Sequence, residues 1–306
     1  MAARSERVLI TGATGFTGRL LAGRLRQNGR EVIAFSHGAD EEGVRNVDLR
    51  DFRSLTHAVS QIRPSAVVHL AGIAATDHSD IGEVYSANVV GTANLFAALV
   101  AAKIEPQIVI VASSAQVYAA PKGNAPLTED CPLAPQSHYA VSKRTAEDIA
   151  RIYSSRFAVL VTRPFNYTGP GQSSSFLVPK IVQHYAEGKS EIRLGNLELF
   201  RDFSDVGRVV EAYCRLVSDA IEPVTVNICS GRSVHLADIP KILEEISGRS
   251  IEVITDRSLV RGDEPHVIAG SPLRLERLVG PLPNPEFRET LLHMYELCKR
   301  QAAAAR

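Results

Sequence analysis

Short apolar runs alternate with amphipathic segments along this chain, and this alternation limits its fold more than any other feature. The expected strands are Val8–Thr11, Glu31–Ser36, Val44–Val47, Ala66–His69, Gln107–Ala112, Ala158–Thr162 and Val224–Ile228. The expected helices between them are Gly15–Asn28, Phe52–Ile62, Asn88–Ala102 and Tyr139–Ser154. Strands that are apolar on both sides need cover on both faces, so the pattern predicts an α/β fold with a doubly wound, mostly parallel sheet. Ligands in such sheets bind beyond the carboxyl ends of the strands.

The first expected strand runs into a glycine-rich turn with the spacing G-x-x-G-x-x-G, formed by Gly12, Gly15 and Gly18. Glycines let the backbone approach a pyrophosphate, and the following helix N-terminus offers N–H donors. A glycine turn without a ligand is the alternative. The N-terminal position of the turn and the next strand at Glu31–Ser36 favour a nucleotide. Dinucleotide contacts are expected from Gly12, Thr14, Gly15, Phe16 and Gly18.

Tyr139 and Lys143 stand four residues apart, a spacing that places two side chains on one face of a helix. A phenol has an ordinary pKa of about 10, and a neighbouring cation favours its ionised form. Such a phenol can exchange a proton with a sugar or alcohol oxygen. This spacing also occurs by chance on many helices, but together with the glycine turn it indicates a catalytic pair.

The two motifs resemble those of the extended short-chain dehydrogenase/reductases that act on nucleotide sugars. Further matches run through most of the chain: Asp48-Leu49, Leu70-Ala71-Gly72, Asn88-Val89-Val90-Gly91-Thr92, Ser113-Ser114, Arg163-Pro164-Phe165-Asn166, Gly169-Pro170-Gly171-Gln172 and Arg201-Asp202-Phe203-Ser204-Asp205-Val206. With this many ordered matches, the chain is identified as a member of that family.

The resemblance implies a Rossmann dinucleotide-binding domain over residues 1–168, with a helix and a strand near residues 205–230 returning to it. Residues 169–204 and 231–306 are then a smaller α/β substrate-binding lobe. The elements expected beyond residue 169 are helices Phe176–Glu187, Val206–Ser218, Val234–Ser247 and Phe287–Lys299 and strands Glu191–Leu194 and Ile251–Thr255. The expected helix Asn88–Ala102 is rich in alanine and leucine, and the expected helix Tyr139–Ser154 also contains several alanines. The equivalent pair forms a dimer interface in the family, which implies a homodimer; ordinary packing on the sheet is the alternative.

The resemblance also assigns roles at the active site. Tyr139 is the acid/base, Lys143 holds the nicotinamide ribose and lowers the phenol's pKa, and Ser114 or Ser113 bonds the substrate oxygen. The other cofactor contacts implied are Ser36, His37, Asp48, Leu49, Leu70, Ala71, Gly72, Asn88 and Pro164. Asn88 is expected to brace the active-site backbone rather than to touch substrate.

The end of the second expected strand bears on the cofactor. NAD enzymes place a carboxylate there for the ribose hydroxyls, and it would repel a 2′-phosphate. Here the strand ends in Ser36-His37-Gly38, with no acid and no arginine beside it. The sequence favours NADP, with Ser36 or His37 on the phosphate. NAD stays open, because acidic residues follow at positions 40–42.

Gln116 bears on the reaction, because family members that dehydrate sugars carry a glutamate there and an amide cannot remove a carbon-bound proton. Hydride transfer with simple protonation remains. The stretches Phe165–Gln172 and Gly195–Phe203 are similar to the GDP-mannose branch. That likeness implies NAD(P)H-dependent reduction of the 4-keto group of a GDP-linked 4-keto-6-deoxyhexose, of the GDP-4-keto-6-deoxymannose to GDP-rhamnose type. The substrate contacts implied are Gln116, Asn166, Phe176, Lys180, Arg201, Arg261 and Glu264.

Alternatives remain at three points. Arg201-Asp202 and Arg261-Asp263 could be surface ion pairs. An NAD-retaining 4-epimerase of a nucleoside-diphosphate sugar needs the same tyrosine, lysine and serine. A non-catalytic cofactor sensor or scaffold is more distant, because such proteins usually lose the tyrosine or the lysine.

Composition bears on partners and location. Lysine plus arginine and aspartate plus glutamate number 34 each, so no global field favours nucleic acid or an anionic membrane. No apolar run is expected to span a bilayer, and the N-terminus lacks a signal-peptide core. The 4 cysteines lack C-x-x-C spacing, and the 9 histidines form no metal cluster. A cytoplasmic protein with reduced thiols and no metal is expected.

Overall fold

The structure is a computed structural model and describes residues 7–38, 41–74, 80–121, 123–218, 223–260 and 264–304. Its largest sheet has 7 strands in the order β10-β6-β5-β4-β1-β2-β3, and every pairing in it is parallel. The strands are β1 (Arg7–Thr11), β2 (Glu31–Ser36), β3 (Val44–Asn46), β4 (Ala66–His69), β5 (Ile108–Ala112), β6 (Val159–Pro164) and β10 (Thr225–Ile228). The predicted doubly wound parallel sheet is confirmed.

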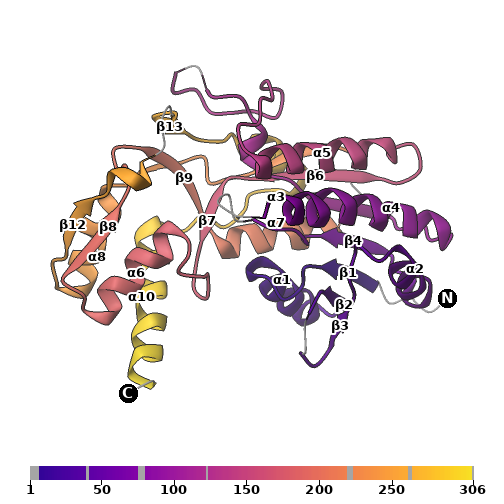
Figure 1. The fold of residues 1–306 in the computed structure, drawn as a ribbon, viewed down its shortest axis with the longest axis horizontal. Helices are drawn as coiled ribbons and strands as arrows, with labels where there is room; N and C mark the ends of the chain where they lie inside the picture. Colours follow the sequence, from indigo (N-terminus) through magenta and orange to yellow (C-terminus); the bar gives the residue numbers. More distant parts are fainter. Residues whose placement is uncertain are drawn as a thin grey trace.

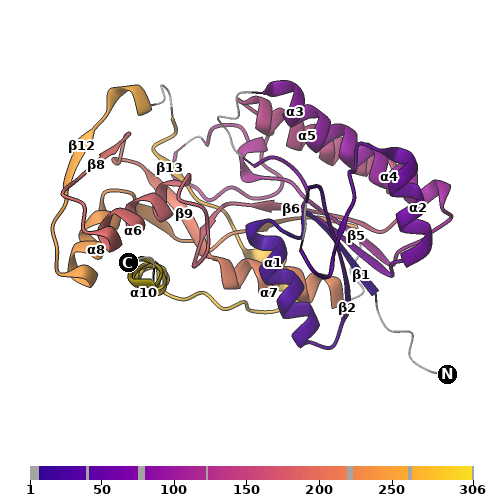
Figure 2. The ribbon, with the colours of Figure 1, turned by 60° about the horizontal axis from the view of Figure 1, so that its bottom comes forward.

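Helices cover both faces of this sheet (Figures 1 and 2). On one face lie α1 (Phe16–Gln27) and α7 (Val206–Ser218), and on the other lie α2 (Phe52–Ile62), α4 (Gly91–Ala101) and α5 (His138–Ile152). Strand β1 shows how the sequence specifies two cores. Val8 and Ile10 point into the core under α1 and α7, whereas Leu9 points into the core under α2 and α4. Complete burial of each such side chain stabilises the fold by about 1.5–3 kcal/mol.

The helix expected from Asn88 begins earlier than predicted. Its parts are α3 (Ile81–Tyr85), a π-helical turn (Ser86–Val90) and α4. The side chain of Asp80 caps it by accepting a hydrogen bond from the backbone N–H of Glu83, 3.0 Å away. The π turn contains Asn88, and such turns often mark functional positions.

The continuous helix Ile81–Ala101 corrects the expectation that no apolar run is long enough to span a bilayer. It has 21 residues, and an 18-residue window of it has a mean hydropathy of 1.4, so by length and composition alone it could cross a membrane. Of that apolar window, 44% is buried inside the fold, against α2 and α5. A core helix can have the same length and hydropathy, and the partial burial of this helix fits that description as well.

A smaller lobe lies beside the large sheet (Figure 1). Helices α6 (Leu177–Glu187), α8 (Asp238–Ser247) and α10 (Phe287–Ala304) enclose its core together with the parallel strands β8 (Glu191–Leu194) and β12 (Glu252–Thr255). The sequence predicted the strands of this pair. A short helix, α9 (Leu273–Val279), follows on the side of α7.

Strand β9 (Phe200–Asp205) was not predicted, and it organises the region between the lobe and the large sheet. It pairs with β7 (Asn166–Thr168), β11 (Ser233–His235) and β13 (Val267–Ile268). The predicted helix Val234–Ser247 is therefore wrong at its first residues, because Val234 pairs with β9 and the helix begins at Asp238.

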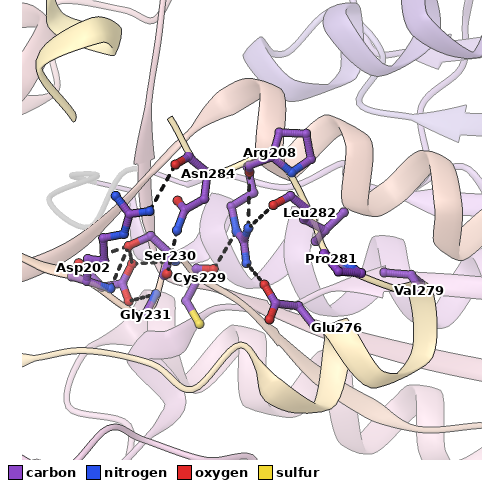
Figure 3. Close-up of polar contacts among 12 residues, drawn as sticks. Asp202, Arg208, Cys229, Ser230, Gly231, Glu276, Val279, Pro281, Leu282 and Asn284 are labelled. Carbon is purple, nitrogen blue, oxygen red and sulfur yellow. Dashed lines mark hydrogen bonds and ion pairs between the residues drawn. The ribbon is translucent and has the colours of Figure 1, made fainter. Parts of the chain in front are cut away.

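Arg208 of α7 anchors the segment that leads to α10 on the side of the large sheet (Figure 3). Its guanidinium is 1% exposed and donates to the carbonyl oxygens of Cys229 (2.8 Å), Leu282 (3.0 Å) and Pro283 (3.2 Å). It also pairs with the carboxylate of Glu276 at 2.7 Å. A single buried cation thus joins α7, the chain leaving β10 and the segment that leads to α10.

Candidate active site

The glycine turn packs so closely that larger side chains do not fit. Gly12 has φ of +70°, and a Cβ there would lie 2.7 Å from the backbone of Ala71. A Cβ on Gly18 would overlap the carbonyl oxygen of Gly12 and lie 2.8 Å from Cα of Ala13. Gly15 caps α1 without a side-chain hydrogen bond. The first N–H groups of α1 are therefore free of side-chain caps, which suits an anion such as a pyrophosphate.

Arg50, which follows β3 in the chain, lies beside the end of β2 and was missed by the sequence analysis. Ser36 is buried, and its hydroxyl lies 2.6 Å from that of Thr14, while His37 is exposed. Nη2 of Arg50 lies 3.1 Å from Nε2 of His37. Arg50 could have been found from the parallel pairing of β2 with β3. This pairing sets Ser36 opposite Asn46, so the segments that follow the two strands lie together.

Arg50 is held by Asp48, the acid of the sequence motif. Its Nη2 and Nε donate to the carboxylate of Asp48 at 2.8 and 2.9 Å. These hydrogen bonds, despite some burial, keep the pKa of Asp48 below its ordinary value. Leu49, between them, is buried beside Gly91 at the start of α4. The Arg50 guanidinium near the end of β2 is thus partly neutralised and fixed in place.

Tyr139, Lys143 and Ser114 meet at the carboxyl end of β5. Ser137 caps α5 by accepting from the backbone N–H of Ala140 at 3.1 Å, which places Tyr139 and Lys143 on its first turns. The side chains of Ser114 and Tyr139 are hydrogen-bonded to each other. All three residues of the cluster are buried.

Burial sets the protonation of this cluster. It raises the pKa of Tyr139 to about 12, although the hydrogen bond from Ser114 acts in the opposite direction. It lowers the pKa of Lys143 to about 8. The expected lowering of the phenol's pKa by Lys143 is not found here, because the Lys143 ammonium donates instead to the carbonyl oxygen of Ala112 at 2.9 Å. The phenol therefore holds its proton at neutral pH.

Ser113 faces away from this cluster. Its hydroxyl donates to Oε1 of Glu147 at 2.6 Å, and the same carboxylate accepts from Arg163 at 2.9 and 2.7 Å. Successive side chains of an extended segment point to opposite sides, so only one of the two serines can face Tyr139. Of the two serines, Ser114 is the one beside Tyr139.

Other predicted cofactor residues line the same edge of the sheet. Leu70 and Ala71 lie against Gly12, and Pro164 ends β6 opposite Ile228. A Cβ on Gly72 would lie 2.5 Å from Oδ1 of Asn88 and 3.3 Å from Nζ of Lys143. Phe16 stacks on Tyr167 of β7, whose hydroxyl lies 2.9 Å from that of Thr17. Tyr167 is a second residue that the sequence analysis did not single out.

Arg201 and Asp202 point in different directions from β9. Nη1 of Arg201 donates to the carbonyl oxygen of Pro265 at 2.9 Å, and its Nη2 lies 4.0 Å from Glu264. Burial lowers the pKa of Arg201. The carboxylate of Asp202 is buried and accepts hydrogen bonds from the backbone N–H groups of Ser230 (2.8 Å) and Gly231 (3.0 Å; Figure 3). A surface ion pair between the two is therefore excluded.

The remaining predicted substrate residues are more dispersed. Gln116 and Asn166 are exposed near the ends of β5 and β6. Phe176 is 43% exposed just before α6, and Nζ of Lys180 donates to the carbonyl oxygen of Arg193 at 3.1 Å. These last two lie in the lobe, away from α5 (Figure 1). Arg261 falls outside the described residues.

Comparison with curated proteins gives similar chains from bacterial sugar metabolism. A GDP-6-deoxy-D-talose 4-dehydrogenase of Aggregatibacter actinomycetemcomitans is 32% identical over 274 residues, covering 90% of this chain and 91% of the relative. A GDP-6-deoxy-D-mannose reductase of Pseudomonas aeruginosa is 30% identical over 297 residues, covering 94% and 95%.

Solved structures share the fold over nearly the whole chain. RMD from Pseudomonas aeruginosa, in complex with NADPH, superposes with a TM-score of 0.84 at 27% identity, covering 97% of this chain and 99% of that one. The UDP-glucose 4-epimerase of Thermus thermophilus, in complex with NAD, gives 0.85 at 25% identity, covering 96% and 99%.

A family model covers most of the chain as well. The model of the NAD dependent epimerase/dehydratase family matches residues 8–229, which run from the glycine turn through Tyr139 and Lys143 to the end of β10. The chain therefore belongs to the NAD dependent epimerase/dehydratase family, within the extended short-chain dehydrogenase/reductases.

Proposed function

We propose that this protein reduces the 4-keto group of a GDP-linked 4-keto-6-deoxyhexose with NADPH. The observation that carries the proposal is the buried phenol of Tyr139 beside the hydroxyl of Ser114, with Gln116 on the following turn. A group that holds its proton at neutral pH can give it to a carbonyl oxygen. Gln116 cannot take a proton from carbon, as a dehydratase would require.

In the proposed reaction, the reduced nicotinamide supplies a hydride to carbon 4 of the sugar. Ser114 donates a hydrogen bond to the carbonyl oxygen, and Tyr139 passes its proton to the same oxygen, so the ketone becomes a secondary alcohol. Lys143 is a buried cation near the phenol, and it stabilises the negative charge that develops on the oxygen and then on the tyrosine. The glycine turn holds the dinucleotide at the edge of the sheet where these side chains lie.

The GDP-linked substrate is inferred from two sources. Both relatives reported above are named for GDP-6-deoxysugars. Arg201 is fixed by the carbonyl oxygen of Pro265 and near Glu264, and a guanidinium is suited to bidentate contact with a diphosphate.

The test is a thermal-shift titration with GDP, UDP, dTDP and CDP in the presence of NADP and of NAD. GDP at about 100 times its dissociation constant is expected to stabilise the protein by about 2.7 kcal/mol, and the other nucleotides by less at equal concentration. A clear shift with UDP or dTDP and none with GDP would remove the substrate assignment.

The preference for NADP is inferred from Arg50 and His37, which stand beside Ser36 where a 2′-phosphate would lie. Arg50→Ala is expected to raise KM for NADPH about tenfold or more, the scale of one lost charged hydrogen bond, and to change KM for NADH little. Steady-state rates with both cofactors measure this. Arg53→Ala is the control, because Arg53 is exposed on the neighbouring helix α2. Equal changes with both cofactors would contradict the assignment.

A 4-epimerase that retains NAD is the second candidate, favoured by the likeness to the Thermus enzyme bound to NAD. It predicts NAD bound to the purified protein and turnover without added cofactor. A mass spectrum of the protein's released nucleotides distinguishes the two reactions.

The protein is also proposed to act as a cytoplasmic homodimer that pairs through α4 and α5. Apolar side chains exposed on the elements of this helical pair support the dimer: Ile81 (46%) begins α3, Val90 (46%) ends the π-helical turn that leads into α4, and Ile152 (74%) ends α5. Light scattering of the purified protein gives its mass in solution.

A further inference from the structure

A row of buried polar side chains connects the glycine turn with the catalytic helix. Thr11 ends β1 directly before Gly12, His69 ends β4, and Thr92 lies on α4. Nδ1 of His69 is 2.7 Å from the hydroxyl of Thr11, and its Nε2 is 2.9 Å from the hydroxyl of Thr92. All three side chains are at most 2% exposed. The imidazole therefore joins two strand ends to the helix.

The surrounding bonds define which nitrogen of His69 carries hydrogen. The hydroxyl of Thr92 donates its single hydrogen to the main-chain carbonyl oxygen of Asn88 at 2.6 Å. It can therefore only accept from His69. Burial, and then the nearby ammonium of Lys143, lowers the pKa of His69 to about 3, so the ring is neutral. Hydrogen is then on Nε2, and Nδ1 accepts from Thr11, whose oxygen accepts in turn from the N–H of Ala71 at 3.3 Å.

The row continues from Asn88 to Tyr139. The Asn88 amide is oriented by Ile73, whose N–H it accepts at 2.7 Å and whose carbonyl oxygen it contacts at 3.1 Å. Its Nδ2 also donates to the hydroxyl of Ser142 at 2.9 Å. The Ser142 hydroxyl donates to the main-chain carbonyl oxygen of Tyr139 at 2.8 Å. Every donor in the row has an acceptor, so the row has one arrangement of hydrogens.

We propose that His69, held as the Nε2–H tautomer between Thr11 and Thr92, is a positioning residue that fixes Asn88 and Ser142, and through them Tyr139, relative to the glycine turn. The proposal rests on the proposed role of Tyr139 as the proton donor. Thr92 bonds the very residue, Asn88, that braces the loop beside Gly72 and Lys143. Loss of the imidazole's bonds should thus displace the phenol without removing any group that touches substrate.

A pair of substitutions at Thr92 tests this coupling. Thr92→Val keeps the shape and removes the hydroxyl, and Thr92→Ser restores it. The valine variant is expected to lose about tenfold in kcat, the effect of one hydrogen bond, with the dissociation constant of NADPH within about twofold of the wild type. The serine variant should recover most of the rate. Rate loss in both variants would assign the effect to packing of the methyl group and overturn the proposal, as would a valine variant with full kcat.

Thr56→Val is the matched control. Thr56 on α2 also donates to the carbonyl oxygen four residues earlier, that of Phe52, at 2.7 Å. It has no histidine partner among the described contacts, so this variant should keep full kcat. A comparable loss there would mean that the helical bond alone, and not the link to His69, carries the effect.

A spectroscopic measurement tests the tautomer without any variant or substrate. Long-range ¹H–¹⁵N correlation spectra of the ¹⁵N-histidine-labelled protein should show one buried ring with hydrogen on Nε2, unchanged from about pH 5 to 8, since His69 does not titrate there. His69→Gln assigns the signal. Hydrogen on Nδ1 would overturn the proposal. If the wild type reduces no GDP-linked ketosugar, the proposed function fails, whereas this spectrum still decides the tautomer.

Discussion

Tyr139→Phe is expected to lower kcat by about two to four orders of magnitude, the usual contribution of a positioned general acid. The phenylalanine ring fills the same buried space, since Tyr139 is only 9% exposed, and it lacks only the hydroxyl that we propose as the proton donor. The dissociation constant of the dinucleotide should stay within about threefold, because the glycine turn and the other expected cofactor residues are unchanged in this variant. Oxidation of NADPH at saturating substrate and fluorescence titration of the cofactor measure the two quantities.

Tyr213→Phe is the control for this change. Tyr213 is a buried tyrosine of α7 whose hydroxyl lies 2.9 Å from that of Thr162, so its loss also removes one buried hydrogen bond. Its kcat should stay near that of the wild type. Full activity in Tyr139→Phe would exclude the acid role, and a protein that binds cofactor without any turnover in its wild-type form would be a sensor or scaffold.

Glu147→Ala is expected to lower the free energy of unfolding by about 3–5 kcal/mol. The carboxylate of Glu147 has no exposed surface, and it accepts from Arg163, which is 4% exposed, and from Ser113. Its removal leaves a buried guanidinium without its counterion, and that unpaired charge is the main cost. Urea denaturation of the two proteins gives the difference, provided that the m-value is unchanged.

Asp148→Ala is the matched control on the next residue of α5. Asp148 also pairs with arginines, at 2.9 Å with Arg144 and 2.5 Å with Arg151, but its side chain is 46% exposed. Such pairs contribute about 0–1 kcal/mol, because water solvates the separated charges well. A loss in Asp148→Ala as large as that in Glu147→Ala would show that burial is not the deciding factor.

Elements could be predicted best where the pattern of apolar residues in a segment matches the burial of that segment in the fold. The strands of the large sheet are apolar on both sides because both faces are covered, and their positions could therefore be predicted. Strand β9 could not, since Arg201, Asp202 and Asp205 make it resemble a loop. Its polar groups are satisfied by distant partners, such as Ser230 for Asp202, and local sequence carries no trace of them.

At the active site, residue types were predictable and their geometry was not. From the sequence, both Ser113 and Ser114 were candidates for the substrate contact. They differ in the structure because the Ser113 hydroxyl donates to Glu147, the buried partner of Arg163. Arg50 stands next to His37 because two parallel strands end side by side, which a linear reading does not reveal. The high pKa of Tyr139 results from burial by segments distant in sequence.

The hydrogen bonds and the ion pair of Arg208 limit how far α7, the end of β10 and the segment around Leu282 can move apart. The partners of Arg208 all lie on the side of the large sheet: Cys229 follows β10, Glu276 is on α9, which packs against α7, and Leu282 belongs to the core under α1 and α7. Separating these groups would leave a desolvated guanidinium unpaired, so the segment that leads to α10 is anchored to the large sheet, and this anchor fixes where the chain enters the lobe.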